Sequence, residues 1–270
     1  MNRPNRGNRR QDQPCCDFHH LHEVKATQKR PLISRLFWVG CWLGGVLGGA
    51  ALPVSAQLCG QDYTSDVQRV RAQAENLPGA RPRLVLLGSS SFRKWPETDT
   101  VFPRHDVVNA GVGGSCFSDL LALHESLLVP LRPNVLLIYE GDNDLADGVP
   151  VDEVVANAEL LFGAIQERLP DTEVVVVAPK ASLARANLRD TYLELNARLR
   201  NAVEARGMHW VDFWAVQHTP EGTLRDELFE ADRLHLNDNG YAVWVAELRR
   251  QLPWLDPKNH VATGPARHAP

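Results

Sequence analysis

The chain has 270 residues, of which 44% are hydrophobic and 23% charged, a composition that suits one sizeable globular domain. Its formal net charge is −4, but residues 1–35 carry +5 and residues 36–56 carry no charge, so the remainder of the chain carries −9. An acidic body of this kind argues against nucleic acid or anionic lipid as the main partner.

The amino end contains an apolar segment, residues 36–56, that follows a basic extension. Small residues at Val54-Ser55-Ala56 suit a signal peptidase, so we expect cleavage before Gln57 and export to the periplasm or the medium. The segment is also long enough to span a bilayer, and an uncleaved membrane anchor is the alternative. We therefore expect an extension with a leader or anchor in 1–56, a domain in 57–255 and a disordered tail in 256–270.

Cysteine usage is compatible with an oxidising compartment. Cleavage before Gln57 would leave two of the five cysteines, Cys59 and Cys116. A disulfide between them would join the new amino end to the body of the domain. Two unrelated buried thiols are the alternative.

The body of the chain alternates helical and strand patterns. Helices are predicted over 62–77, 117–128, 151–169, 188–206 and 240–252. Strands are predicted over 83–88, 106–110, 134–139, 173–178 and 209–213. Strands that alternate with helices form βαβ units and hence a parallel sheet covered on both faces. The predicted fold is α/β, a flavodoxin-like three-layer sandwich with a five-stranded parallel sheet.

A serine cluster follows the first predicted strand. The four residues Gly88-Ser89-Ser90-Ser91 place a serine just beyond the carboxyl end of this strand, which is the edge where α/β sheets bind ligands. Taken alone, this sequence is also compatible with a solvated turn. Polar stretches at 109–115 and 140–144 follow the next two strands and would reach the same edge, which favours a functional site.

A second motif, Asp232-x-x-His235, stands just before the last predicted helix. An aspartate three residues before a histidine can accept a hydrogen bond from Nδ1, which leaves Nε2 free to act as a base. With the serine cluster, this motif completes the order Ser…Asp…His. The α/β-hydrolase elbow needs Gly-x-Ser-x-Gly, and Phe92 occupies the position of its last glycine.

Four blocks in this order resemble the SGNH hydrolases, the GDSL-type lipase and esterase family, over about residues 83–250. Gly88-Ser89-Ser90 matches the Gly-Asp-Ser block of the family, with Ser89 in place of its aspartate. Gly114 stands five residues after an asparagine, as the family glycine does, and Gly141-Asp142-Asn143-Asp144 matches Gly-x-Asn-Asp in full. Asp232-x-x-His235 matches the last block.

The resemblance implies a role for each matched residue. Ser90 would be the nucleophile, His235 the base and Asp232 the acid of a catalytic triad. The oxyanion hole would consist of the backbone N–H groups of Ser90 and Gly114 and the side-chain amide of Asn143. No metal or cofactor is needed for this chemistry.

The expected function is a serine esterase that hydrolyses short-acyl or acetyl esters, with acetylated carbohydrate or lipid as the substrate. A lysophospholipase or thioesterase acting on longer acyl chains is the alternative within the enzyme class. A non-catalytic protein that binds acylated glycan is the alternative outside it. Asp142 and Asp144 are interpreted as residues that hold the loop around Asn143 rather than as metal ligands.

Overall fold

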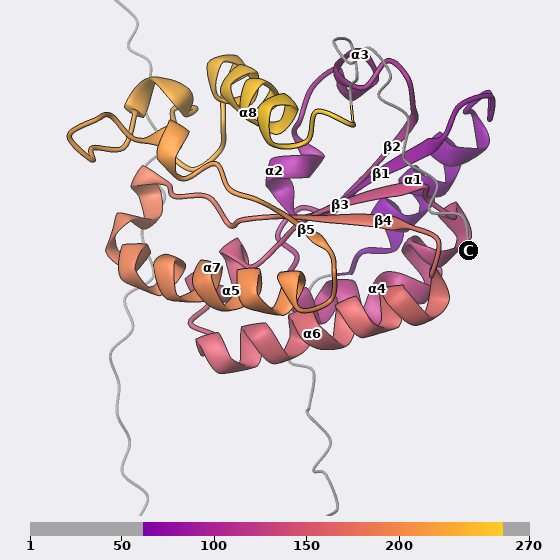
Figure 1. Cartoon of the computed structure of the whole chain (residues 1–270), viewed down its shortest axis with the longest axis horizontal. Coiled ribbons are helices and arrows are strands. Elements are labelled where there is room, and N and C mark those ends of the chain that lie inside the picture. The colour runs from indigo at the N-terminus through magenta and orange to yellow at the C-terminus, as the bar shows by residue number, and fades with distance from the viewer. Residues whose placement is uncertain (1–61, 256–270) are drawn as a thin grey trace, which may run out of the picture. The chain divides into compact units, whose positions relative to one another are not determined.

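The computed structural model describes residues 62–255, which form an α/β sandwich around one parallel sheet (Figure 1). Its strands are β1 (Arg83–Gly88), β2 (Asp106–Gly111), β3 (Val135–Tyr139), β4 (Glu173–Val177) and β5 (His209–Val211). The strand order is β2-β1-β3-β4-β5, and all neighbouring strands are parallel. This is the flavodoxin-like order, so the predicted fold is confirmed.

The central strands are buried on both faces, as their uninterrupted aliphatic sequences predict. Every residue from Leu84 to Gly88 is buried, and so is every residue of β3. β1 and β3 lie side by side in the middle of the sheet. Their carboxyl ends are therefore held in fixed register by the core.

Helices cover both faces of the sheet. One face carries α1 (Thr64–Glu75), α4 (Phe117–Leu127), α5 (Asp142–Ala146), α6 (Val151–Arg168) and α7 (Arg189–Glu204). The other face carries α2 (Ser90–Arg93), α3 (Thr98–Val101) and α8 (Asp238–Gln251). Four 3-10 turns complete the described elements: η1 (Val129–Leu131), η2 (Leu183–Leu188), η3 (Ala215–Gln217) and η4 (Asp226–Leu228).

On the face of the sheet that carries α2, α3 and α8, an aromatic cluster joins α2 to α8. Trp244 is fully buried and stacks on Phe213 with ring centroids 4.6 Å apart. Trp95 stacks on Tyr241 at 5.6 Å, and the Tyr241 hydroxyl donates a hydrogen bond to Ser91 O at 2.8 Å. These contacts hold the segment that begins at Ser90 against the helix that begins just after His235.

The predicted strands and long helices are present within a few residues of their expected bounds. Three one-turn helices, α2, α3 and α5, lie in stretches that the sequence pattern assigns to loops. A helix of four or five residues is too short to show a hydrophobic period, so the pattern could not reveal them.

The expectations for residues 1–56 and 256–270 concern parts of the chain outside the described residues. Cys116 is disulfide-bonded, and its partner also lies outside them, so pairing with Cys59 stays a prediction. Between residues 62 and 255, no helix is both long and apolar enough to cross a membrane.

Candidate active site

The carboxyl ends of β1, β2 and β3 bring three polar loops together. In the sheet register, Gly88 is paired with Gly111 of β2 on one side and with Tyr139 of β3 on the other. Gly88 has a φ of +148°, and a Cβ there would lie 2.0 Å from Tyr139 O, so only glycine fits. The residues after these strands therefore leave the sheet at the same edge.

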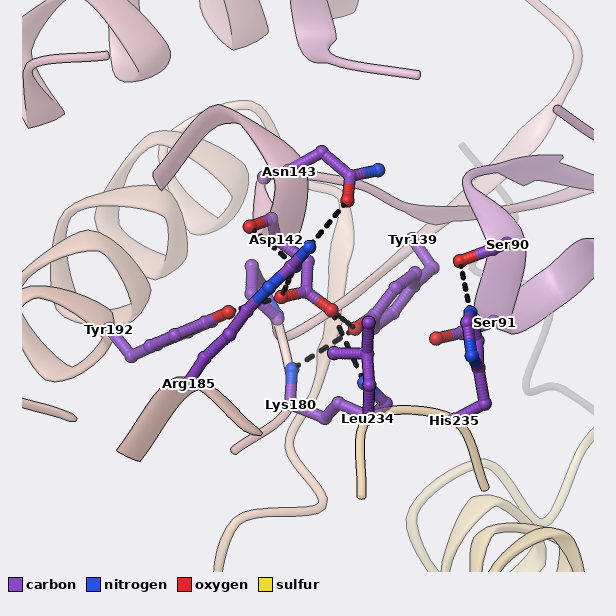
Figure 2. Close-up of polar contacts among 12 residues, drawn as sticks. Ser90, Ser91, Tyr139, Asp142, Asn143, Lys180, Arg185, Tyr192, Leu234 and His235 are labelled. Carbon is purple, nitrogen blue, oxygen red and sulfur yellow. Dashed lines mark hydrogen bonds and ion pairs between the residues drawn. The ribbon is translucent and has the colours of Figure 1, made fainter. Parts of the chain in front are cut away.

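Ser90 is the member of the serine cluster that faces the site. It opens α2 and is partly exposed, whereas Ser89 and Ser91 are buried. Ser90 Oγ lies 2.9 Å from His235 Nε2 (Figure 2). The predicted nucleophile and the predicted base are thus within hydrogen-bond distance although they are 145 residues apart in the sequence.

Asp232 binds His235 through both of its carboxylate oxygens. Oδ2 lies 2.6 Å from His235 Nδ1, and Oδ1 accepts the backbone N–H groups of Leu234 and His235, each at 2.9 Å. Arg233 between them has a φ of +58°, a left-handed turn that folds the aspartate back onto the histidine.

The contacts of this turn determine which ring nitrogen of His235 faces Asp232 and which faces Ser90. Desolvation acts to raise the pKa of Asp232, but the hydrogen bonds from the His235 ring and from the two backbone N–H groups outweigh it and hold that pKa well below its usual value. An ionised Asp232 only accepts hydrogen bonds, so the proton of a neutral His235 ring sits on Nδ1. His235 Nε2 is then the acceptor for the Ser90 hydroxyl.

Gly114 lies in the loop between β2 and α4 and is partly exposed with a φ of +80°. Two buried carboxyl groups bind the backbone of the residues that come after Gly114 in the chain. Asp144 accepts the Phe117 N–H at 3.1 Å, and Asp119 accepts the Cys116 N–H at 2.9 Å. Asp144 therefore holds the Gly114 loop from across the site, which extends the predicted role of this residue.

Asn143 is on α5, facing the Gly114 loop. Its Nδ2 donates to Ser115 O at 2.9 Å, and its Oδ1 accepts from Arg185 Nη2 at 3.0 Å. A carbonyl can only accept and a guanidinium can only donate, so both partners require the same orientation of the amide. In Figure 2 the amide nitrogen lies on the side of Ser90, and the oxygen turns toward Arg185.

A buried charge cluster that no sequence motif predicted lies behind Asn143. Asp142 Oδ2 lies 3.2 Å from Lys180 Nζ, and Asp142 Oδ1 is paired with Arg185 Nη1. The hydroxyls of Tyr139 and Tyr192 also donate to the Asp142 carboxylate. Burial acts to raise the pKa of Asp142, but Lys180 and Arg185 overcome it and lower that pKa to about 2.

Lys180 and Arg185 come from the segment after β4, about forty residues beyond Asp142. The one available sequence signal was that this segment also follows a strand and so reaches the same edge. Asp142 was predicted to hold the loop around Asn143. It also binds two cations, Lys180 and Arg185, from the loop that follows β4.

Glu140 is a second buried carboxyl group at the end of β3. Burial, helped by nearby Asp144, raises the pKa of Glu140 well above its usual value, despite opposing hydrogen bonds from Ser115 and Gly141. Ser115 Oγ lies 2.7 Å from Glu140 Oε2 and 3.1 Å from Val112 O. A hydroxyl has one hydrogen, so Ser115 donates either to the Glu140 carboxyl group or to Val112 O at any one time.

The structure brings all five predicted site residues to this edge, and no predicted site residue lies elsewhere. Among residues 62–255 there is no group of three or more His, Cys, Asp or Glu side chains arranged to hold a metal ion.

Comparisons with known proteins agree with this fold. Solved structures that resemble it include a protein from Streptococcus pneumonia described provisionally as a platelet activating factor (TM-score 0.61, 20% identity, 71% of this chain and 91% of that chain covered). A GDSL-like lipase from Bacteroides thetaiotaomicron has a TM-score of 0.58 at 18% identity and covers 70% of this chain and 97% of its own. An acetylxylan esterase from Geobacillus stearothermophilus has a TM-score of 0.54 at 18% identity, with 63% and 94% covered.

A comparison with curated proteins found no match. The family model described as GDSL-like lipase/acylhydrolase matches residues 79–243, which include Ser90, Gly114, Asn143, Asp232 and His235. The chain therefore belongs to the GDSL-like lipase/acylhydrolase family.

Proposed function

We propose that this protein is a serine esterase that hydrolyses carboxylic esters through an acyl-enzyme intermediate. The observation that carries the proposal is the continuous chain of contacts from Ser90 Oγ to His235 Nε2 at 2.9 Å and from His235 Nδ1 to Asp232 Oδ2 at 2.6 Å. A serine hydroxyl is a weak nucleophile unless a base accepts its proton.

The reaction has two steps. Ser90 Oγ attacks the ester carbonyl as His235 Nε2 takes the hydroxyl proton, and this proton then passes to the departing alcohol. Water attacks the acyl-enzyme with His235 again as base, which releases the carboxylic acid and restores Ser90. Asp232 stays ionised and stabilises the imidazolium in both steps.

The negative charge on the tetrahedral intermediate would be stabilised by three donors. These are the backbone N–H groups of Ser90 and Gly114 and the second N–H of the Asn143 amide, whose first N–H donates to Ser115 O. The positive φ of Gly114 supports this role, because it is a backbone conformation that a residue with a side chain rarely adopts.

Short acyl groups, C2 to C4, are the proposed substrates, with acetyl esters of carbohydrate as the first to test. The support for short chains is the loop over residues 214–225, which is short and carries no apolar insertion that could cover a long acyl chain. The acetylxylan esterase among the fold neighbours supports acetylated carbohydrate as a test substrate.

A panel of esters from acetyl to palmitoyl, assayed with the wild type and with Ser90→Ala, tests this proposal. We expect hydrolysis that is fastest for C2 to C4 and absent in the variant. A rate that rises with chain length would favour a lysophospholipase or thioesterase. No turnover of any ester, with retained affinity for acylated glycan, would favour a binding protein.

We also propose that the protein is exported, on the basis of the apolar segment 36–56 and the small residues that end it. Amino-terminal sequencing of protein recovered from the periplasm or medium should begin near Gln57. Recovery only from membranes, with residues 36–56 retained, would contradict this and support an anchor.

A further inference from the structure

Arg185 connects the buried charge cluster to the amide of Asn143. Its Nη1 donates to the Asp142 backbone carbonyl at 2.9 Å and is paired with Asp142 Oδ1, while its Nη2 donates to Asn143 Oδ1 at 3.0 Å. One guanidinium thus spans two consecutive residues of α5. The planar fork of arginine permits this, and the single ammonium of lysine would not reproduce it.

The cluster itself is buried and carries a net positive charge. Asp142 is the single anion, Lys180 and Arg185 are two cations, and the tyrosine hydroxyls that donate to Asp142 are neutral because their pKa values are raised. Lys180 has a fully buried side chain, and that of Asp142 is 5% exposed. Arg185 is therefore held by Asp142, a partner whose side chain is buried.

Arg185 fixes the orientation of the Asn143 amide together with the Ser115 carbonyl, which binds the other end of the amide. The oxygen and nitrogen ends of an amide are nearly equal in size, so a rotation of 180° costs little sterically. Such a rotation would turn the oxygen, which carries lone pairs, toward the reacting carbonyl. Arg185 has no acceptor atom, so it stabilises only the orientation that directs the nitrogen toward the Ser90 side.

We propose that Arg185, anchored by Asp142, is a positioning residue for the oxyanion hole, an inference that rests on the proposed esterase function. Arg185 fixes Asn143 with its nitrogen toward the substrate. It also polarises the amide, because a cation on the carbonyl oxygen strengthens the N–H groups as donors. The oxyanion then meets a preorganised donor and needs no rearrangement during the reaction.

Arg185→Met tests this, since methionine keeps much of the side-chain bulk without a donor. We expect kcat to fall by about 10- to 100-fold, with KM changed less than about twofold, because the contact acts on the developing charge. Lysine at this position can reach Asp142 or Asn143 but not both. The kcat of Arg185→Lys should therefore lie between that of the wild type and that of Arg185→Met. Arg200→Met is the matched control, because Arg200 forms an exposed pair with Glu204 on α7.

The same substitutions in an Asn143→Ala background separate positioning from a structural role. Without the amide there is nothing to position, so Arg185→Met should then lower kcat by less than about threefold. The inference would be overturned if the effects of Arg185→Met and Asn143→Ala on kcat were fully additive. It would also be overturned if Arg185→Met alone left kcat unchanged. Absence of esterase activity in the wild type would instead refute the proposed function.

Thermal melting is recorded for every variant, and Arg185→Lys provides the comparison if Arg185→Met does not fold. In the Asn143→Ala background, lysine and arginine at position 185 should give equal kcat. A lower kcat for lysine in that background would show that Arg185 acts by another route and would contradict the proposal.

Discussion

At the scale of single residues, the site depends on hydrogen-bond partners that permit only one arrangement. Asp232 is ionised and accepts from His235 Nδ1, which leaves Nε2 as the acceptor for Ser90. Asn143 is held between a carbonyl and a guanidinium, which admit one orientation of its amide. The hydrogen-bonded arrangement of the site is thus fixed without a ligand, which is what electrostatic preorganisation would require of the proposed esterase.

Asn143→Ala should lower kcat by about 10²- to 10³-fold, the usual loss for one oxyanion-hole donor. KM should change little, because the donor interacts mainly with the charge that develops in the transition state. Steady-state kinetics on a short-chain ester measure both quantities. An effect confined to KM would show that Asn143 binds only the ground state of the substrate.

At the scale of elements, the one-turn helix α5 links the sheet to the loop that follows β4. Asp142 at its start binds Lys180 and Arg185, and Asp144 two residues further binds the N–H of Phe117 at the start of α4. Two carboxyl groups on one short helix therefore fix the loops on both sides of it.

Asp142→Asn should destabilise the fold far more than Lys180→Met. The first change leaves two cations without their anion, which costs about 3–5 kcal/mol when a buried pair loses one partner. The second leaves Asp142 with Arg185 and two tyrosine hydroxyls, so we expect a loss below about 2 kcal/mol. Urea unfolding gives both free energies, and the reverse order would contradict this charge balance.

Glu140 at the end of β3 makes stability depend on pH. Because burial raises its pKa, folded Glu140 keeps a proton that the unfolded chain releases near about pH 4.3. This contribution to stability is complete below that pH and is lost as the pH rises toward the folded-state pKa. Burial also raises the pKa of Asp144, to about 7, which adds a loss of the same sign.

Glu140→Gln removes the proton equilibrium at this position and keeps the shape of the side chain. The stability of the variant relative to the wild type should therefore increase between about pH 4.5 and 7.5. Denaturant midpoints across this range measure the difference. Glu167→Gln, at an exposed position on α6, is the control and should run parallel to the wild type. Parallel curves for Glu140→Gln as well would show that Glu140 is ionised in the folded protein.

At the scale of the whole molecule, the sheet and the contacts among Ser90, Asp232 and His235 were predictable because their signals are local. Five aliphatic segments separated by helical patterns specify a parallel sheet, and a serine, an asparagine and a histidine placed after strands must meet at its edge. Asp232 and His235 are three residues apart, so their contact needs only a turn.

The cluster behind Asn143 could not be predicted in this way. Lys180 and Arg185 contact Asp142 only because β4 lies beside β3, and no local pattern specifies which side chains of two loops will pair. The departure from the family block at Ser89 leaves the contact between Ser90 and His235 unaffected. Ser89 is a buried residue that precedes α2 and does not reach His235, so the nucleophile assignment to Ser90 does not depend on it.

The most direct test of the account is to identify which side chain a fluorophosphonate probe modifies. Such a probe reacts with a serine that a base activates, and peptide mass spectrometry locates the adduct among Ser89, Ser90 and Ser91. We expect one adduct per chain, on Ser90, and none in Ser90→Ala or His235→Ala. An adduct on Ser89 or Ser91, or labelling of Ser90 that persists in His235→Ala, would contradict the assignment of Ser90, His235 and Asp232 as one catalytic unit.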